Sequence, residues 1–320
     1  MWLINMKICV FNPQSEFSKD QQKQLSQLGK VVYTKTREQL PIEQLLKLVK
    51  NADVLAVGID VIGGFERGRE TLINIIESLP NLKGIAVDTT DTQWIDLDLC
   101  RKRKIVISNI PISIYRETVA EHTIALLLCV AKRVIITDRR TQKRKYRLVK
   151  GFEVKNKTLG VIGLGNIGSR VAEMARCFGM KVIAYNRSPK KLRDVEMKSI
   201  EKVLNESDVI SLHTTYEEEN KGMISEEEIE KMKKGVVIVN TADRSLVDER
   251  AMADAIKNGK VDSYVYEAED LENTPLAKVE NAIGLKGFGW YTKEALDKAF
   301  EVWVDNIVTI VKNRPQNRVV

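Results

Sequence analysis

The segment TLGVIGLGNIGSRVAEMARCFGMKVIAYNRS, residues 158–188, constrains the fold of this chain more than any other feature. An apolar run leads into Gly163, Gly165 and Gly168, a helical stretch follows, and a second apolar run closes the segment. A lone GxGxxG pattern is weak evidence, but a strand before it and a helix after it are the context in which such glycines bind a pyrophosphate. The segment therefore predicts a Rossmann unit, from about Lys157 to Lys191, that holds a dinucleotide.

Each glycine in this pattern has a separate task. Gly163 permits the tight turn, Gly165 lets the pyrophosphate approach the backbone, and Gly168 lets helix and strand pack closely. Asn166 and Ile167 open the helix, whose first N–H groups and positive dipole end favour an anion. We expect these five residues to contact the cofactor.

The turn after the second strand predicts which dinucleotide is bound. An NAD site usually has Asp or Glu there to accept the ribose 2′-hydroxyl, whereas this chain has Asn186, followed by Arg187, Ser188, Lys190 and Lys191. Without a carboxylate, and with an arginine that can donate two parallel hydrogen bonds, the turn favours NADP(H) over NAD(H). The alternative is an exposed lysine-rich turn beside a permissive site.

At 320 residues, the chain is long enough for two domains. Short β-branched runs alternate with longer amphipathic stretches, which predicts parallel strands joined by helices and hence an α/β fold. The predicted strands are 7–10, 31–33, 53–57, 84–87 and 105–108 in a first sheet, and 158–162, 181–185, 208–212, 235–240 and 261–266 in a second.

Three helices are predicted from periodicity and capping. One is the apolar stretch around 119–132, and another is the amphipathic stretch 292–312 near the end of the chain. The third begins at Ser225, where Glu228 three residues later predicts a capping box.

The charge of the chain is local. Of its net charge of +7, most comes from Asp138–Lys150, where seven Lys or Arg accompany one acid. We interpret this run as a solvated arm after a helix. A nucleic-acid surface would use such a cluster as well, but no nucleic-acid motif accompanies it, so nucleic acid is not an expected partner.

Composition also limits cofactors and location. The four cysteines are scattered without a CxxC pair, so neither disulfides nor a metal site is expected. The longest apolar run, Ile124–Ala131, is far below a membrane span. We expect a soluble, cytoplasmic protein with no membrane partner.

Over nearly its full length the chain resembles the D-isomer-specific 2-hydroxyacid dehydrogenases. The resemblance implies a flavodoxin-like substrate domain from residues 1–111 and 287–320, a doubly wound dinucleotide-binding domain from residues 112–286, and a cleft between them. It also implies a homodimer through the nucleotide domains and a small-molecule substrate. The motifs that carry it are Val119–His122, Gly151–Glu153, Ser211–His213, Met232–Gly235, Asn240–Ala242, Leu246–Glu249 and Trp290–Thr292.

The same resemblance assigns further cofactor contacts. They are His213, Thr214 and Thr215 after one strand, Thr241 and Ala242 after the next, and Glu267, which replaces an Asp that contacts the nicotinamide amide.

The family's catalytic residues are largely missing. Its members use an Arg to orient the substrate, a His as proton donor and a Glu that hydrogen-bonds the His. Ungapped register places Asp243 at the Arg position and Gly287 at the His position. The Glu position falls on Glu272, or on Glu269 if three residues are deleted.

Charge then predicts the substrate. Asp91 occupies a loop position where the family has a Gly near the substrate carboxylate, so Asp91 and Asp243 would replace a carboxylate-binding cradle with two acids. Burying an anionic substrate beside unpaired acids costs on the order of several kcal/mol, because no positive charge compensates the negative ones. We therefore expect a neutral or cationic carbonyl or imine substrate.

A proton source must then replace the missing His. Lys286, beside the vacated position, is the first choice, since a lysine in a partly dry cleft can act as an acid; Tyr291, Arg244 and Glu272 are alternatives. His122 and His213 match structural and cofactor-side positions and are not expected to be acids. A second hypothesis is a dinucleotide-binding protein of the same fold without turnover.

Overall fold

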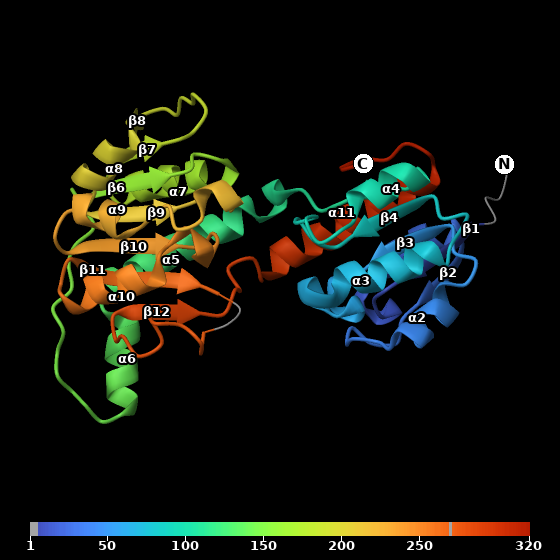
Figure 1. Cartoon of the computed structure of the whole chain (residues 1–320), viewed down its shortest axis with the longest axis horizontal. Helices are drawn as coiled ribbons and strands as arrows, with labels where there is room; N and C mark the ends of the chain where they lie inside the picture. The colour runs from blue at the N-terminus through green and yellow to red at the C-terminus, as the bar shows by residue number, and fades with distance from the viewer. Residues whose placement is uncertain (1–5, 269–270) are drawn as a thin grey trace. The chain divides into compact units, whose positions relative to one another are not determined.

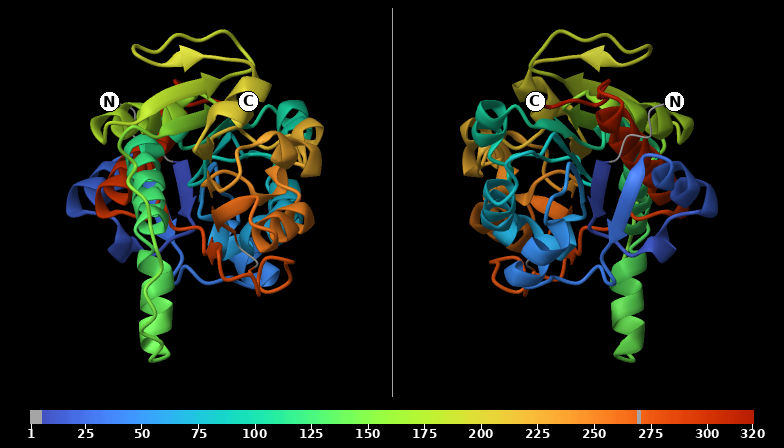
Figure 2. Two further views of the ribbon diagram at one scale, coloured as in Figure 1. Left: turned by 90° about the vertical axis from the view of Figure 1, so that its left-hand side faces the viewer. Right: turned by 90° about the vertical axis from the view of Figure 1, so that its right-hand side faces the viewer.

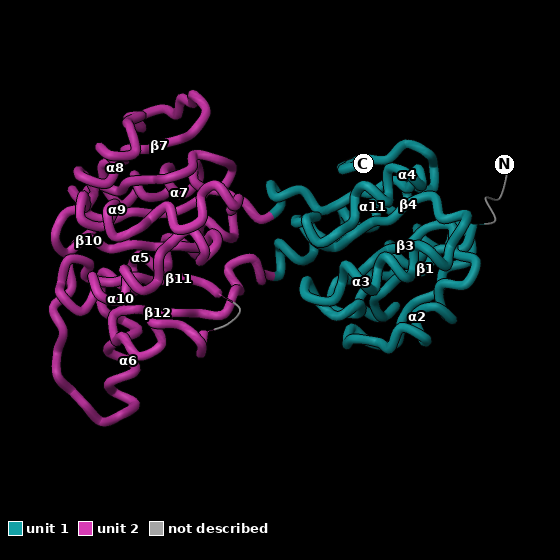
Figure 3. The backbone as a smooth tube through the Cα atoms, in the orientation of Figure 1, with its two compact units in different colours: residues 1–114, 293–320 teal, residues 115–292 magenta. Residues whose placement is uncertain are grey.

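The computed structural model describes residues 6–268 and 271–320, which form two compact units. Unit 1 comprises residues 1–114 and 293–320, and unit 2 comprises residues 115–292 (Figure 3). The chain thus leaves unit 1, builds the whole of unit 2, and returns to complete unit 1 with its last helix.

Unit 1 is a five-stranded parallel sheet with the strand order β2-β1-β3-β4-β5, the flavodoxin-like order (Figure 1). Its strands are β1 (Met6–Val10), β2 (Gly29–Tyr33), β3 (Val54–Val57), β4 (Gly84–Val87) and β5 (Val106–Ser108). Its helices are α1 (Lys19–Ser26), α2 (Ile42–Val49), α3 (Gly64–Glu77), α4 (Leu97–Arg103) and α11 (Lys293–Val311). The buried strands β3 and β4 are apolar throughout, as expected for a parallel sheet covered on both faces.

Unit 2 is a seven-stranded parallel sheet with the order β12-β11-β10-β9-β6-β7-β8. Its strands are β6 (Thr158–Ile162), β7 (Lys181–Tyr185), β8 (Glu196–Met197), β9 (Val209–Leu212), β10 (Val236–Asn240), β11 (Val261–Glu267) and β12 (Ala282–Leu285). Its helices are α5 (Arg116–Ala131), α6 (Val134–Gln142), α7 (Asn166–Cys177), α8 (Ile200–Glu206), α9 (Glu226–Lys231) and α10 (Glu249–Lys257). The chain reverses its direction of travel across the sheet between β6 and β9, which makes this pair the topological switch point.

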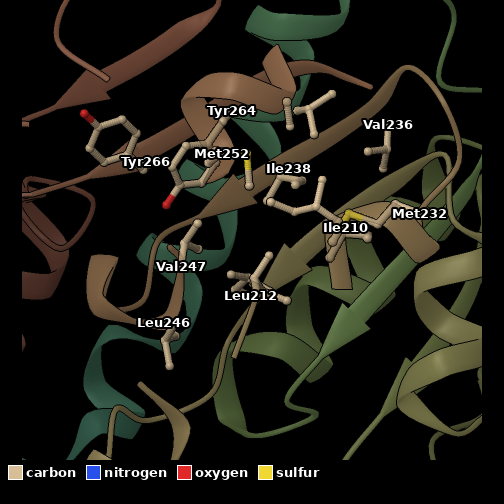
Figure 4. Packing of buried hydrophobic residues seen from close by; sticks show 14 of the residues in the cluster. Ile210, Leu212, Met232, Val236, Ile238, Leu246, Val247, Met252, Tyr264 and Tyr266 are labelled. Carbon is tan, nitrogen blue, oxygen red and sulfur yellow. The ribbon is translucent and has the colours of Figure 1, made fainter. Parts of the chain in front are cut away.

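One of the cores of unit 2 lies between β9, β10, β11 and the helices α8, α9 and α10. Figure 4 shows Ile210, Ile238 and Met252 packed together there, with Tyr264 and Tyr266 beside them. The two tyrosine rings stack with centroids 4.8 Å apart. This core fixes the strands whose carboxyl ends carry the candidate site.

The fold class predicted from the sequence is confirmed, and all ten predicted strands are present. The second sheet is larger than predicted, because β8 and β12 were not foreseen. The predicted capping box is wrong: Ser225 does precede α9, but its hydroxyl donates to the Glu228 carboxylate and caps no backbone N–H group. The ionised carboxylate of Glu228 is a strong acceptor, so the Ser225 hydroxyl donates to it.

The basic run Asp138–Lys150 begins inside a helix, which the sequence had not indicated. It starts within α6, which projects from the body of unit 2, and the chain returns from the tip of α6 to β6 (Figures 1 and 2). Most of its side chains are exposed, whereas Arg140 is bound to Glu280 by two hydrogen bonds.

Within the part of the chain that the structure describes, no helix has the length and apolarity needed to span a bilayer. The four cysteines are free thiols, and no cluster of three His, Cys, Asp or Glu side chains in the described ranges is arranged for a metal ion.

Candidate functional site

The candidate cofactor residues gather at one edge of the unit 2 sheet. Because all of its strands are parallel, the loops after β6, β7, β9, β10 and β11 leave from the same edge. The glycine turn follows β6, Asn186 follows β7, His213 follows β9 and Thr241 follows β10. The fold therefore brings together residues that are up to about eighty positions apart in the sequence.

The glycine turn sits at the switch point. Gly163 has φ +96°, and a Cβ atom there would lie 2.6 Å from the carbonyl of His213, so the turn packs directly on the loop after β9. A Cβ atom on Gly168 would lie 2.0 Å from the carbonyl oxygen of Gly163. Both positions exclude any side chain for reasons internal to the protein.

Gly165 is different, because a Cβ atom there would have no protein atom within 4 Å. Gly165 is also the N-cap residue of α7. Glycine has no side chain that could cap the N–H groups of the helix, and the first turn of α7 contains no acidic residue. The free N–H groups of Asn166, Ile167 and Gly168 and the dipole of a 12-residue helix thus meet open space. These features fit a dinucleotide pyrophosphate.

The turn after β7 is tied to the glycine turn. Asn186 accepts a hydrogen bond from the N–H of Leu164 (2.9 Å) and donates one to the carbonyl of Ser188 (2.8 Å). The Lys190 ammonium donates to the carbonyl of Leu164 (2.7 Å). Asn186 and Lys190 therefore hold the turn in shape through these hydrogen bonds. They also make the turn more positive than one with an acidic residue at position 186.

Arg187 forms an ion pair with a residue that was not predicted from the sequence. Its guanidinium donates to Glu217 (2.9 Å), in the loop after β9, and the Arg187 side chain remains 78% exposed. The run of acids around Glu217 was visible in the sequence, but the pairing spans two loops and has no sequence signal. A phosphate at this turn would compete with, or join, the Glu217 carboxylate.

The loops after β9 and β10 present small polar groups. His213 is half-buried, and desolvation of its ring lowers its pKa to about 4, so the ring is neutral and shares a 2.7 Å hydrogen bond with Ser211. The loop continues through Thr214 and Thr215, the latter fixed by Asn220 through its carbonyl. A neutral His213 adds no charge beside the glycine turn.

The segment after β10 is held by hydrogen bonds that involve side chains. The Thr241 hydroxyl lies 2.9 Å from the hydroxyl of Thr123 on α5, and the N–H of Ala242 donates to Asn240. Asp243 is exposed, and its carboxylate caps a short 3-10 turn by accepting the N–H of Ser245 (2.7 Å).

Arg244 is committed to a structural ion pair. It donates to both oxygens of Glu249 (2.7 and 2.6 Å), and Thr274 donates to the same carboxylate. Such a bidentate pair holds the guanidinium firmly, which disfavours a role for Arg244 in orienting a substrate.

Glu267 anchors the segment that follows β12. One of its oxygens accepts the N–H groups of Phe288 (2.8 Å) and Gly289 (2.9 Å) and lies 3.2 Å from Nε2 of His122. Burial alone would raise the pKa of Glu267, but the contact with His122 and the two N–H groups outweigh it and lower that pKa. The Thr118 hydroxyl donates to the carbonyl of Gly289 (3.0 Å), which completes the anchor.

Of the other predicted catalytic residues, three lie in unit 2 and one lies in unit 1. Glu272, Lys286 and Tyr291 are exposed in unit 2, Tyr291 to 59%. Glu269, the alternative to Glu272, lies outside the described residues. Asp91 belongs to unit 1, where its carboxylate accepts the N–H of Gln93 (2.9 Å) in the loop after β4.

Asp88, at the end of β4, is a titratable group that the sequence reading did not single out. It accepts the N–H of Ile59 (3.1 Å), and burial raises its pKa to about 7, with a smaller contribution from Asp60. A carboxyl group whose pKa lies near neutrality owes that pKa to its surroundings, which only the fold reveals.

Comparisons with known proteins agree with this geometry. Residues 124–285 match the family model of the D-isomer specific 2-hydroxyacid dehydrogenase, NAD binding domain. A glyoxylate reductase of Korarchaeum cryptofilum is 32% identical over 260 residues, which are 77% of this chain and 78% of that protein. The chain belongs to the D-isomer specific 2-hydroxyacid dehydrogenase family. Residues 124–285 are therefore an NAD(P)-binding domain in a family of oxidoreductases.

Two further similarities bear on the length and the chemistry of the family. A D-3-phosphoglycerate dehydrogenase of Methanocaldococcus jannaschii is 31% identical over 98% of this chain, but the chain spans only 59% of that protein. The solved structure of an acyclic imino acid reductase in complex with NADPH and D-arginine has a TM-score of 0.81 and 25% identity, covering 98% of this chain and all of that one. The proteins similar to this chain thus include a glyoxylate reductase, a D-3-phosphoglycerate dehydrogenase and an imino acid reductase.

Proposed function

We propose that this family member is an NADP(H)-dependent reductase of a neutral or cationic carbonyl or imine compound, and not of an ordinary 2-keto acid. In this proposal unit 2 holds the dinucleotide and unit 1 contributes the substrate domain of a cytoplasmic homodimer. The bound cofactor supplies a hydride for the carbon of the C=N or C=O bond, and a protein group supplies the proton to the nitrogen or oxygen.

The observation that carries the proposal is the acid at position 243. Ungapped register between Asn240–Ala242 and Leu246–Glu249 places Asp243 where the family has its substrate-binding Arg. The carboxylate of Asp243 is exposed at the carboxyl end of β10, on the cofactor edge of the sheet. An anion at this position repels a substrate carboxylate and favours an iminium or an ammonium-bearing carbonyl.

Cofactor choice in the proposal rests on Asn186 and Arg187. No carboxylate lies directly after β7. The exposed guanidinium of Arg187 can bind a 2′-phosphate, and its hydrogen bond to Glu217 keeps the guanidinium in position. Among the candidate proton donors, Lys286 remains first and Tyr291 and Glu272 remain alternatives, whereas Arg244 is disfavoured by its pairing with Glu249.

The test has two steps. Calorimetric titration with NADPH and NADH should show tighter binding of NADPH, and Arg187→Ala should weaken NADPH binding by about tenfold while leaving NADH binding nearly unchanged. Oxidation of NADPH should then be followed with small aldehydes and ketones that lack a carboxylate, each alone and with an excess of ammonia or methylamine, and with pyruvate, glyoxylate and hydroxypyruvate as keto-acid controls. We expect turnover of a carboxylate-free carbonyl or of its imine, and none of the three keto acids.

Rapid reduction of the keto acids alone would refute the substrate class. Binding of NADPH without turnover of any carbonyl or imine would favour the second candidate, a dinucleotide-binding protein without catalysis. That candidate is supported by the capping role of Asp243 and the ion pair of Arg244, since both side chains near the lost Arg already serve the fold.

A further inference from the structure

A polar cavity lies in unit 2, away from the cofactor edge. It has a volume of about 300 Å³ and is formed where β6, β9, β10 and β11 begin, so it lies at the amino edge of the sheet. Its charged lining consists of five cations, Arg133, Lys150, Lys157, Lys233 and Lys234. Two carboxylates, Asp208 and Asp262, accompany them, which leaves a net formal charge of +3.

Arg133 forms a fixed wall of this cavity. It is 8% exposed, and its guanidinium donates to the carbonyl of Lys150 (3.1 Å), the hydroxyl of Ser263 (3.0 Å) and the carboxylate of Asp262 (2.7 Å). Three bonds from a buried guanidinium tie the end of the basic arm to β11. The cavity wall is thus built into the fold.

Both acids of the lining are already neutralised. Asp262 is paired with Arg133, and Asp208 accepts the N–H of Thr158 (2.8 Å) and the ammonium of Lys233 (3.1 Å). Burial by itself would raise the pKa of Asp208, but these two donors outweigh it and lower that pKa. Both carboxylates are therefore already engaged by partners within the protein.

Three lysines are left over. Among the described residues, the ammonium groups of Lys150, Lys157 and Lys234 form no hydrogen bond and no ion pair within 4 Å. Like charges held around one concavity repel one another, and an anion between them removes that repulsion.

We propose that this cavity is a binding site for a small phosphorylated anion, separate from the dinucleotide site. Three unpaired ammonium groups suit a multiply charged phosphate chain, because lysine binds phosphate as a mobile point charge. The volume admits a pyrophosphate group or a small phosphate ester, and Phe152 in the lining offers an apolar surface to the rest of such a molecule.

The test uses inorganic pyrophosphate as the probe and the full chain carrying Gly165→Asp. This substitution puts a negative charge at the open N-cap of α7 and so removes the glycine turn as a competing phosphate site. Lys157→Gln with Lys234→Gln, which keeps the aliphatic stems, should weaken pyrophosphate binding by about tenfold or more in calorimetry at low salt.

The matched control is Lys202→Gln with Lys278→Gln, two exposed lysines of unit 2 outside the cavity lining, which changes the net charge equally. It should change binding by less than about twofold. An equal loss in the control would mean diffuse attraction to a basic protein, and no binding in the Gly165→Asp protein would mean that pyrophosphate uses only the glycine turn. Either result overturns the proposal. Circular dichroism of each variant checks that the fold is retained.

Discussion

At the scale of single residues, the three glycines of the turn after β6 are required for two different reasons. Gly163 and Gly168 are required by neighbouring backbone, since a Cβ atom at either would lie within 2.6 Å of it. Gly165 has no such neighbour, and its φ of −77° is open to any residue. Stability therefore explains two of the glycines, and only a ligand explains the third.

This difference predicts opposite outcomes for alanine substitutions. Gly163→Ala must adopt φ +96° against the His213 carbonyl, and it should lower the free energy of unfolding by about 2–4 kcal/mol. Gly165→Ala should change it by less than about 0.5 kcal/mol, yet weaken NADPH binding by about tenfold or more, because the methyl group occupies the space of the pyrophosphate.

Urea denaturation followed by circular dichroism, together with calorimetric titration of NADPH, measures both quantities. The interpretation fails if Gly165→Ala binds NADPH as the unmodified chain does. It fails as well if Gly165→Ala is as destabilised as Gly163→Ala, since Gly165 would then have a structural role.

At the scale of secondary structure, α11 completes unit 1 although it comes from the end of the chain. Trp303 on this helix is 1% exposed, and its indole N–H donates to the carbonyl of Ala86 on β4 (2.9 Å). Its ring also stacks on Phe17 at 5.8 Å. The contact joins residues more than two hundred positions apart.

Replacing this tryptophan should therefore weaken unit 1. Trp303→Phe removes the indole donor and leaves a small void, so we expect a loss of about 1–3 kcal/mol in the free energy of unfolding. Trp290→Phe, at a side chain that is 41% exposed, is the matched control and should cost less than about 0.5 kcal/mol. Urea titrations of the two variants give the comparison, and equal costs would contradict the assigned role of Trp303.

The elements that the sequence predicted well are those with a strong local signal. β6, β7 and β4 are found at their predicted bounds, because each is a short apolar run limited by turn residues. β8 has only two residues, and β12 at the sheet edge contains Gly284, so neither carries enough β-branched sequence to be recognised. Their position depends on neighbours already in the sheet.

The candidate site, too, was predictable only where the sequence carries a local signal. The glycine turn follows from local geometry, and the structure supports each of its three glycines on separate grounds. The pairing of Arg187 with Glu217, and that of Arg244 with Glu249, depend on loops from different elements. Burial, which neutralises His213 and keeps Asp88 protonated, is likewise a property of the folded chain alone.

At the scale of the whole molecule, burial shifts the pKa of Asp88 in unit 1 and that of His213 in unit 2, and the two shifts have opposite consequences. In unit 1 burial raises the pKa of Asp88 from 3.8 to about 7. In unit 2 burial lowers the pKa of His213 from 6.5 to about 4. Both groups are neutral in the folded protein near pH 5–6, whereas both are charged in the unfolded chain.

The two units should therefore respond in opposite directions as the pH rises from about 5 to about 6.5. Folded Asp88 keeps a proton that the unfolded chain has lost, so unit 1 loses stability; unfolded His213 carries a proton that the folded state lacks, so unit 2 gains stability. Each effect should amount to roughly 1 kcal/mol per pH unit at most.

Hydrogen exchange of peptides from β4 and β9, corrected for the intrinsic rate, measures the two units separately. Asp88→Asn should flatten the pH dependence of the β4 peptides and leave that of the β9 peptides unchanged. If both sets of peptides changed together, the units would unfold as one, and the separate assignment of these two groups would be wrong.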